Sequence, residues 1–466
     1  MVWLKAILIL PSHSLEDRYN KHIAKAGGYF PPLGILYLAS YLRKDGHKVK
    51  IIDGTFTSEE SMLKQIEEFN PDLIGITTFT FLWDITKNLI KNIKSKFPNI
   101  FISIGGPHAT SDSDNCFKEC EYFDALIYGE GEETLSELTK KLENKESLKD
   151  VKGLSFRDNG EVIKNEKREL IKDLDNLPFP ARDLIPLKKY VPSAEQYRRK
   201  PVTNLMTARG CPYNCLFCPS LGFDKYRRRS PENVMKEIKH LVKDYGVREI
   251  YFFDDTFTIS KEWVMKFCDL LLNEKLDLIW TVNARANTVN YEVLAKMKEA
   301  GCWKLWFGLE SGVQKNLDTL NKRITVEQAR NAVKICRKLD LEVEASFILG
   351  IPGETYKEAL QTINFAKEIG VDYAQFFPLT PLPDTPLGNN IDKYGRILIS
   401  ESKYYNETMV VFTPYSMTSE ELKKLIPLAY RSFYIRPSCI LHHLKKIRSF
   451  EDIRRYFRGA LTLFSM

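Results

Sequence analysis

The first 145 residues alternate short apolar runs with amphipathic stretches. Runs with the length and composition of buried strands lie at 5–10, 48–53, 72–78, 100–106 and 124–130. Between them, apolar positions recur with a helical period at 33–44, 58–69, 82–96 and 132–143. This alternation predicts an open, doubly wound parallel sheet, and such sheets bind their ligands at the carboxyl ends of the strands.

Small and polar residues follow several of these predicted strands, which would let a large ligand approach the backbone. They lie in TTFT (77–80), GGPHAT (105–110) and GEGEE (129–133). No G-x-G-x-x-G motif follows the first strand, and its absence argues against a dinucleotide-binding site.

A proline-punctuated connector at 173–186 precedes a second alternating series. Its apolar runs lie at 203–208, 248–253, 278–284, 303–309, 343–349 and 372–377, with helical patterns such as 231–244 and 354–369 between them. Six βα units of this kind predict a partial parallel barrel. We therefore predict an α/β chain with a Rossmann-like domain at 1–150, a linker at 151–195, a partial (β/α)6 barrel at 196–395 and a mainly helical region at 396–466.

In parallel barrels, functional residues lie on the loops that follow the strands. Each predicted strand of the second series is followed by residues that can bind a ligand or take part in a reaction. In chain order these are three cysteines (211–218), Asp254 with Asp255, Asn283 with Arg285, ESG (310–312), GIPGET (350–355) and PLTPLPDTP (378–386). The sequence therefore predicts one active site at the carboxyl end of this barrel.

The loop RGCPYNCLFCPS, residues 209–220, carries three of the nine cysteines in a C-x3-C-x2-C pattern. The chain has 466 residues, 44% of them hydrophobic, and it shows no secretory signal and no apolar stretch of membrane-spanning length, so we expect a cytoplasmic protein with reduced thiols. A structural zinc site needs four ligands, and no histidine lies within twenty residues of Cys218. Three thiolates suit a 4Fe–4S cluster with one iron left open, although a zinc site stays an alternative.

This loop resembles the signature of the radical S-adenosylmethionine (radical SAM) enzymes, including Phe217 before the last cysteine. The resemblance implies that Cys211, Cys215 and Cys218 hold a 4Fe–4S cluster and that the open iron binds SAM. In that family an electron from the cluster cleaves SAM to methionine and a 5′-deoxyadenosyl radical. The residues that correspond to the family's SAM contacts are Phe217, Asp254, Asp255, Asn283, Arg285, Glu310, Ser311, Ile348, Gly350, Pro352 and Pro378.

The N-terminal region narrows the resemblance to the cobalamin-binding radical SAM enzymes. FPPLGILYLASYL (30–42), GGPHAT (105–110), YGEGEET (128–134) and LPFPARDL are similar to segments of that subgroup. The D-x-H-x-x-G motif that supplies a histidine ligand to cobalt in cobalamin-dependent mutases is absent here, because Asp53 is followed by GTFTSEE. The expected cobalamin contacts are Pro11, Leu33, Gly34, Thr77, Thr78, Phe79, Gly105, Gly106, His108, Gly129 and Glu130. His108 is a candidate cobalt ligand, and hydrogen bonding to the backbone or to a cofactor amide is the alternative.

The resemblance implies a methyltransferase that acts on an unactivated carbon. One SAM would methylate cobalamin, a second would yield the radical that takes hydrogen from the substrate, and the substrate radical would then take the methyl group. Similar enzymes, the anaerobic Mg-protoporphyrin monomethyl ester cyclases and hopanoid-modifying enzymes, leave ring closure or rearrangement open as outcomes. A more remote alternative is a zinc-containing nucleic-acid-binding protein that uses KYRRR (225–229) and the basic tail.

The net charge of +7 is concentrated at the C-terminus, where residues 422–466 carry ten Lys or Arg against Glu451 and Asp452. This tail could meet a membrane face or a protein partner, or form a solvated helical layer. We expect no nucleic-acid partner. The substrate stays open among a small molecule, a lipid and a protein side chain, and the resemblance implies a low-potential electron donor such as flavodoxin or ferredoxin.

Overall fold

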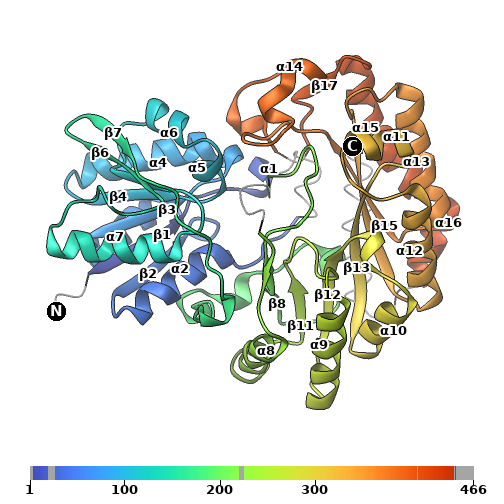
Figure 1. Ribbon diagram of the computed structural model, residues 1–466, viewed down its shortest axis with the longest axis horizontal. Helices are drawn as coiled ribbons and strands as arrows, with labels where there is room; N and C mark the ends of the chain where they lie inside the picture. The colour runs from blue at the N-terminus through green and yellow to red at the C-terminus, as the bar shows by residue number, and fades with distance from the viewer. Residues whose placement is uncertain (1–3, 19–26, 220–224, 407, 446, 448–466) are drawn as a thin grey trace. The chain divides into compact units, whose positions relative to one another are not determined.

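The computed structural model describes residues 4–18, 27–219, 225–406, 408–445 and 447. The chain forms two compact units (Figure 1). Unit 1 comprises residues 1–18, 31–189 and 401–406, and unit 2 comprises 19–30, 190–400 and 407–466. The domain boundaries expected from the sequence stay predictions.

Unit 1 is built on a seven-stranded sheet with the order β2-β1-β3-β4-β5-β6-β7. Its strands are β1 (Lys5–Leu10), β2 (Lys48–Asp53), β3 (Leu73–Thr77), β4 (Phe101–Gly105), β5 (Ala125–Ile127), β6 (Leu154–Asp158) and β7 (Glu161–Lys164). The first five pair in parallel, and β6 and β7 add an antiparallel edge. All five parallel strands match predicted runs, which confirms the doubly wound sheet.

Helices cover both faces of this sheet, with α2 and α7 on one face and α4 and α5 on the other (Figure 1). The helices are α1 (Leu15–Arg18), α2 (Leu33–Lys44), α3 (Glu59–Phe69), α4 (Trp83–Lys96), α5 (Pro107–Ser111), α6 (Ser113–Glu119) and α7 (Glu132–Asn144). Buried side chains of α3, α4, α5 and α6 share one core with the strands. This packing leaves the carboxyl ends of β1 and β3–β5 to loops.

Unit 2 is built on six parallel strands in the order β15-β14-β13-β12-β11-β8. They are β8 (Val202–Leu205), β11 (Glu249–Phe252), β12 (Ile279–Ala284), β13 (Cys302–Glu310), β14 (Glu342–Leu349) and β15 (Tyr373–Pro378). Two short ladders accompany them, β9 (Ala208–Arg209) with β10 (Arg227–Arg228) and β16 (Gly395–Ile397) with β17 (Phe412–Pro414). The sheet confirms the predicted partial barrel.

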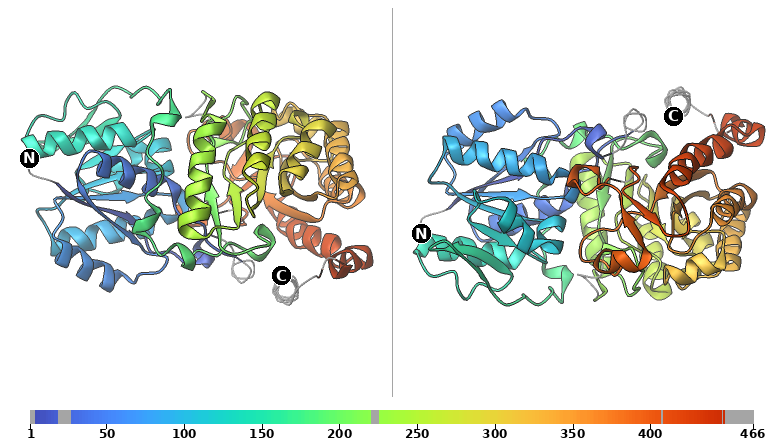
Figure 2. Two further views of the ribbon diagram at one scale, coloured as in Figure 1. Left: turned by 90° about the horizontal axis from the view of Figure 1, so that it is seen from below. Right: turned by 90° about the horizontal axis from the view of Figure 1, so that it is seen from above.

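Helices pack against the outer face of this sheet (Figure 2). They are α8 (Pro231–Tyr245), α9 (Lys261–Glu274), α10 (Tyr291–Glu299), α11 (Gln314–Thr319), α12 (Val326–Lys338) and α13 (Tyr356–Ile369). Then follow α14 (Ile391–Tyr394), α15 (Ser419–Tyr434) and α16 (Pro437–Lys445), so the C-terminal region is mainly helical from residue 419 to 445, as predicted. Residues 446 and 448–466 of the basic tail lie outside the described residues.

Local sequence signals set the ends of the helices. Ser230 caps α8 by accepting a hydrogen bond from the Asn233 amide, and Gly246 ends it with a left-handed φ of 65°. Thr355 and Glu358 form a capping box at the start of α13. No helix of the described residues is long and apolar enough to span a membrane.

Candidate active site and cofactor-binding sites

The three-cysteine loop of unit 2 is held at its base and at its middle. At the base, β9 pairs with β10 on either side of the loop. In the middle, the Leu216 amide donates to the Leu320 carbonyl at 2.9 Å, and the Leu216 carbonyl accepts from the Leu387 amide at 2.9 Å. Asn321 adds a bond from Nδ2 to the Asn214 carbonyl at 2.7 Å. Loops from distant parts of the unit therefore fix the backbone between the cysteines.

Cys215 is buried, and Cys211 and Cys218 are half-buried. Burial raises the pKa of the Cys211 thiol, so the free thiolate is disfavoured until a cation binds it. Among the described residues, no three Cys, His, Asp or Glu side chains stand close enough to hold one metal ion. Three thiols on one loop are the donors that a 4Fe–4S cluster with one open iron uses, each binding one iron, so the donor set fits such a cluster.

The two adjacent aspartates after β11 have different environments. Asp254 is buried and accepts from the amides of Thr207, at 2.6 Å, and Ala208, at 3.1 Å. The Thr207 hydroxyl also donates to it, and Arg228 lies 3.6 Å away. Asp255 is exposed. Asp254 thus fastens the start of the cysteine loop, a role that sequence reasoning missed.

Two of the arginines in KYRRR are also used inside unit 2. The Arg228 guanidinium lies 3.5 Å from the centroid of the Trp263 ring, and Arg229 pairs with Glu237 at 2.5 Å with both side chains buried. Neither is placed for the phosphate contacts of the nucleic-acid alternative.

Glu310, the last residue of β13, has an unusual backbone conformation and forms a buried ion pair. Its φ is +63°, which is rare for a residue with a side chain, and its carboxylate accepts from Lys322 Nζ at 2.6 Å. A Cβ at Gly308 would lie 2.5 Å from Glu310 Oε1 and 2.9 Å from Lys322 Nζ, so a side chain there would crowd this pair. Ser311 is buried and its hydroxyl lies 2.9 Å from that of Thr362. Lys322 was not among the predicted site residues.

Glu354 organises the loop that follows β14. Its Oε2 accepts from the amides of Gly350, at 2.7 Å, and Ile351, at 3.2 Å, while Oε1 accepts from Asn316 at 2.8 Å. Burial raises the pKa of Glu354 to about 7. The loop backbone is thus fixed beside Ile348, Gly350 and Pro352, which are buried like Pro378.

Asn283 and Arg285 lie at the end of β12 on the same face of the sheet. Asn283 is half-buried and accepts from the Tyr251 hydroxyl at 2.8 Å. Arg285 is buried, and its Nη1 lies 3.8 Å from Cys215 Sγ. Phe217 is half-buried within the cysteine loop. The carboxyl end of the unit 2 sheet therefore carries the predicted SAM residues together, and their contacts to SAM stay predictions.

In unit 1, the candidate cobalamin residues follow the carboxyl ends of β1, β3, β4 and β5 or begin α2. Those with exposed or half-buried positions are Leu33, Gly34, Thr77, Phe79, Gly105, Gly106 and Gly129, whereas Pro11 is buried. At Gly106, φ is +98° and a Cβ would lie 2.6 Å from Thr77 Oγ1. Only glycine allows β3 and β4 to approach so closely here, and the resulting small rim suits a bulky cofactor.

Three other candidates point their polar groups into the protein. The Thr78 hydroxyl donates to the Gly105 carbonyl at 2.8 Å and accepts from the Ala109 amide. Glu130 accepts from the Ile171 amide at 2.7 Å. His108 is buried with its ring centroid 5.0 Å from that of Trp83, and burial lowers its pKa to about 4. These side chains stabilise the strand ends, and any contact they make to cobalamin stays a prediction.

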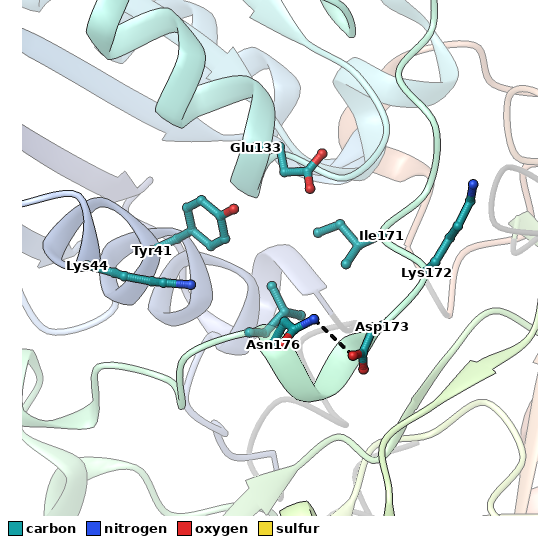
Figure 3. Close-up of a pocket in the computed structure, with 8 residues that line it drawn as sticks. Tyr41, Lys44, Glu133, Ile171, Lys172, Asp173 and Asn176 are labelled. Atoms are coloured by element: carbon teal, nitrogen blue, oxygen red, sulfur yellow. Dashed lines mark hydrogen bonds between the residues drawn. The ribbon is translucent and has the colours of Figure 1, made fainter.

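Two pockets of unit 1 involve residues that sequence reasoning missed. A shallow pocket of about 560 Å³ follows the ends of β1 and β2 and is lined by Ser12, His13, Ser14, Asp17, Gly54, Thr55, Phe56, Thr57, Ser58 and Glu59. A smaller one, of about 190 Å³, lies between Tyr41, Glu133 and the segment 171–177 (Figure 3). Neither pocket is lined by a predicted cofactor residue. The first lies at the sheet edge where ligands of such folds bind, and the signal was the polar run GTFTSEE itself.

The chain matches the Radical SAM superfamily over residues 205–366 and the B12 binding domain over residues 20–139. It belongs to the radical SAM enzymes that also carry a cobalamin-binding domain. Its cofactors are a 4Fe–4S cluster, SAM and cobalamin.

Two relatives and one solved structure illustrate this membership. The chain is 38% identical to an uncharacterized methyltransferase of Pyrococcus horikoshii over 99% of both chains. It is 30% identical to the anaerobic magnesium-protoporphyrin IX monomethyl ester cyclase of Cereibacter sphaeroides, over 97% of this chain and 74% of that protein. One solved structure has the same fold: the radical SAM methyltransferase TsrM from Kitasatospora setae, with cobalamin and a 4Fe–4S cluster bound. Its TM-score is 0.75 at 15% sequence identity, and the match covers 99% of this chain and 98% of that chain. The chain is therefore an enzyme of the cobalamin-dependent radical SAM methyltransferase family.

Proposed function

We propose that this enzyme transfers a methyl group to an unactivated carbon of its substrate. The similarity along the whole chain to the Pyrococcus protein, which is named a methyltransferase, carries this proposal. When bound, the cluster with SAM supplies the radical that removes hydrogen from the substrate, and cobalamin supplies the methyl group. Removing a hydrogen atom needs no general base, so the site requires residues that bind and orient.

The inner face of the unit 2 sheet supports a substrate that forms hydrogen bonds. On this face Asn283, Trp306, Ser346 and Gln375 are half-buried, whereas the outward-facing neighbours pack in the apolar core. Trp306 Nε1 donates to Ser346 Oγ at 2.5 Å, and Gln375 Nε2 donates to Glu344 at 2.6 Å.

The buried Glu344 also pairs with the buried Lys304 at 2.6 Å. A barrel interior is usually filled with branched apolar side chains. These groups already pair with one another, yet they make the inner face polar, and a polar lining of this kind favours a substrate that carries polar groups over a purely hydrocarbon lipid.

We further propose that the enzyme works in the cytoplasm with a low-potential donor such as flavodoxin or ferredoxin. No disulfide bond joins any of the nine cysteines, all of which lie among the described residues, and this suits a reducing compartment. A radical SAM enzyme needs a reductant and a small-molecule or side-chain substrate. We propose flavodoxin or ferredoxin as the reductant and a substrate with polar groups.

The test incubates the reconstituted enzyme under anaerobic conditions with a metabolite extract and with SAM whose transferable methyl group is CD3. C-methylation should give S-adenosylhomocysteine and 5′-deoxyadenosine together, with a labelled methyl group in one product. The Cys215→Ala variant is the control for non-enzymatic SAM breakdown. If 5′-deoxyadenosine forms with neither S-adenosylhomocysteine nor label in any product, ring closure or rearrangement, as in the cyclase relatives, replaces this proposal.

A further inference from the structure

Arg285 is a buried cation that lacks a carboxylate partner. Its side chain is 5% exposed. No Asp or Glu of the described part of the chain forms an ion pair with it, whereas the neighbouring Lys322 is paired with Glu310. A buried charge without a counter-charge is strongly destabilising, so negative charge that no carboxylate of the described residues supplies is expected beside it.

The contacts of Arg285 define where that anion lies. The guanidinium stacks 3.6 Å from the centroid of the Tyr213 ring, Nη2 donates to the Lys322 carbonyl, and Nε faces Asn287 Oδ1 at 3.4 Å. These contacts hold the group in one orientation and leave Nη1 directed at Cys215 Sγ, 3.8 Å away. Tyr213 and Cys215 both belong to the cysteine loop. Arg285 is therefore fixed against the loop and aimed at one of its sulfurs.

We propose that Arg285 is a positioning residue that donates to the Cys215 thiolate and raises the reduction potential of the cluster. A thiolate bound to iron keeps negative charge, and reduction adds one more electron to the cluster. Hydrogen bonds and positive charge next to cluster sulfurs favour the reduced state and so raise the potential. The inference rests on the cluster that this family contains and is independent of whether the product is methylated or cyclised.

The test measures the midpoint potential of the reconstituted cluster without SAM, by titration followed with electron paramagnetic resonance. Arg285→Met should shift the potential to more negative values and lower the ratio of reduced to oxidised cluster at least tenfold at a fixed potential, a shift of about 59 mV for one electron. Arg285→Lys keeps the charge and should shift it less. Arg323→Met removes a nearby exposed arginine and should leave the potential unchanged.

A second variant covers the case in which Arg285→Met does not assemble the cluster. Asn287→Asp places a carboxylate beside Arg285 Nε and neutralises the cation without removing it, so it should shift the potential in the same direction. An unchanged potential in a variant with full iron content, either Arg285→Met or Asn287→Asp, would overturn the proposal. If SAM affinity then falls in Arg285→Met, the missing anion is the SAM carboxylate.

Discussion

Lys322 donates a hydrogen bond to Glu310 at 2.6 Å, and both side chains are more than nine-tenths buried. Lys322 belongs to the loop between α11 and α12, and the same loop accepts hydrogen bonds at the Leu320 and Lys322 carbonyls from Leu216 and Arg285. One loop therefore contacts the cysteine loop through its backbone and the predicted SAM residue Glu310 through a side chain. This connection links the cysteine loop to a predicted SAM residue within unit 2.

Lys322→Met should destabilise the protein because it leaves the Glu310 carboxylate buried without a counter-charge. Breaking a buried ion pair in this way costs about 3–5 kcal/mol. The free energy of unfolding is measured by urea denaturation of the full chain. Lys315→Met is the matched control, because Lys315 is more than half exposed in its pair with the half-buried Glu358, and the loss of such a pair costs about 1 kcal/mol or less. Equal losses in the two variants would contradict the role assigned to the buried pair.

Glu310→Ala should weaken SAM binding more than cobalamin binding. Glu310 lies at the carboxyl end of β13 in unit 2, whereas the cobalamin candidates lie in unit 1. Anaerobic equilibrium dialysis with each cofactor measures the two affinities separately. The double variant Glu310→Gln with Lys322→Met removes both charges and should recover stability without recovering SAM binding. Parallel loss of both affinities in Glu310→Ala would show that Glu310 is not a SAM residue.

Strand positions were predictable because the cores of both units need continuous apolar runs. Ile7 and Ile9 are fully buried in unit 1, and a parallel strand covered on both faces cannot contain many polar residues. The hairpin β6–β7 was missed because β7 reads EVIK, with Val162 exposed, and no apolar run marks it. Its turn at Asn159–Gly160, with φ values of 50° and 89°, carries the Asn-Gly pair that is the strongest short-range sequence signal of a hairpin.

Side-chain direction at the site was less predictable than loop position. The sequence placed Asp254 and Thr78 at strand ends, but it does not reveal that each turns inward to bond backbone groups of a neighbouring loop. Lys322 carries no local signal, because its partner is defined only when β13 and the loop before α12 come together. Contacts between side chains of different loops depend on tertiary packing, and tertiary packing cannot be read from a single sequence.

Cys211→Ala, Cys215→Ala and Cys218→Ala should each abolish SAM cleavage and leave the fold largely intact. The backbone of the loop is held by Leu216, Asn214 and the β9–β10 ladder, none of which uses a cysteine side chain. Iron content and 5′-deoxyadenosine formation are measured after reconstitution, and circular dichroism checks the fold. Cys336→Ala, in the buried core of α12, is the control and should retain cleavage. Cleavage that persists in any of the three loop variants would refute the cluster assignment.

His108 should make unit 1 less stable as the pH falls. Burial lowers its pKa to about 4 against the opposing charges of Glu119 and Asp84, whereas the unfolded chain has the ordinary value of about 6.5. Between these values the unfolded state binds a proton that the folded state does not, so stability is full above about pH 7 and decreases toward pH 4. The loss between pH 7 and pH 5 is about 2 kcal/mol.

Hydrogen exchange of residues 107–119 in the full chain, corrected for the intrinsic pH dependence of exchange, measures this effect. His108→Phe keeps the aromatic contact with Trp83 and should remove most of the difference between pH 7 and pH 5 in this segment. His240→Phe alters an exposed histidine that pairs with Asp244 in unit 2 and should leave the segment unchanged. If the wild-type protein and His108→Phe respond equally to pH, His108 is not held neutral by burial, and another group accounts for the acid sensitivity of this segment.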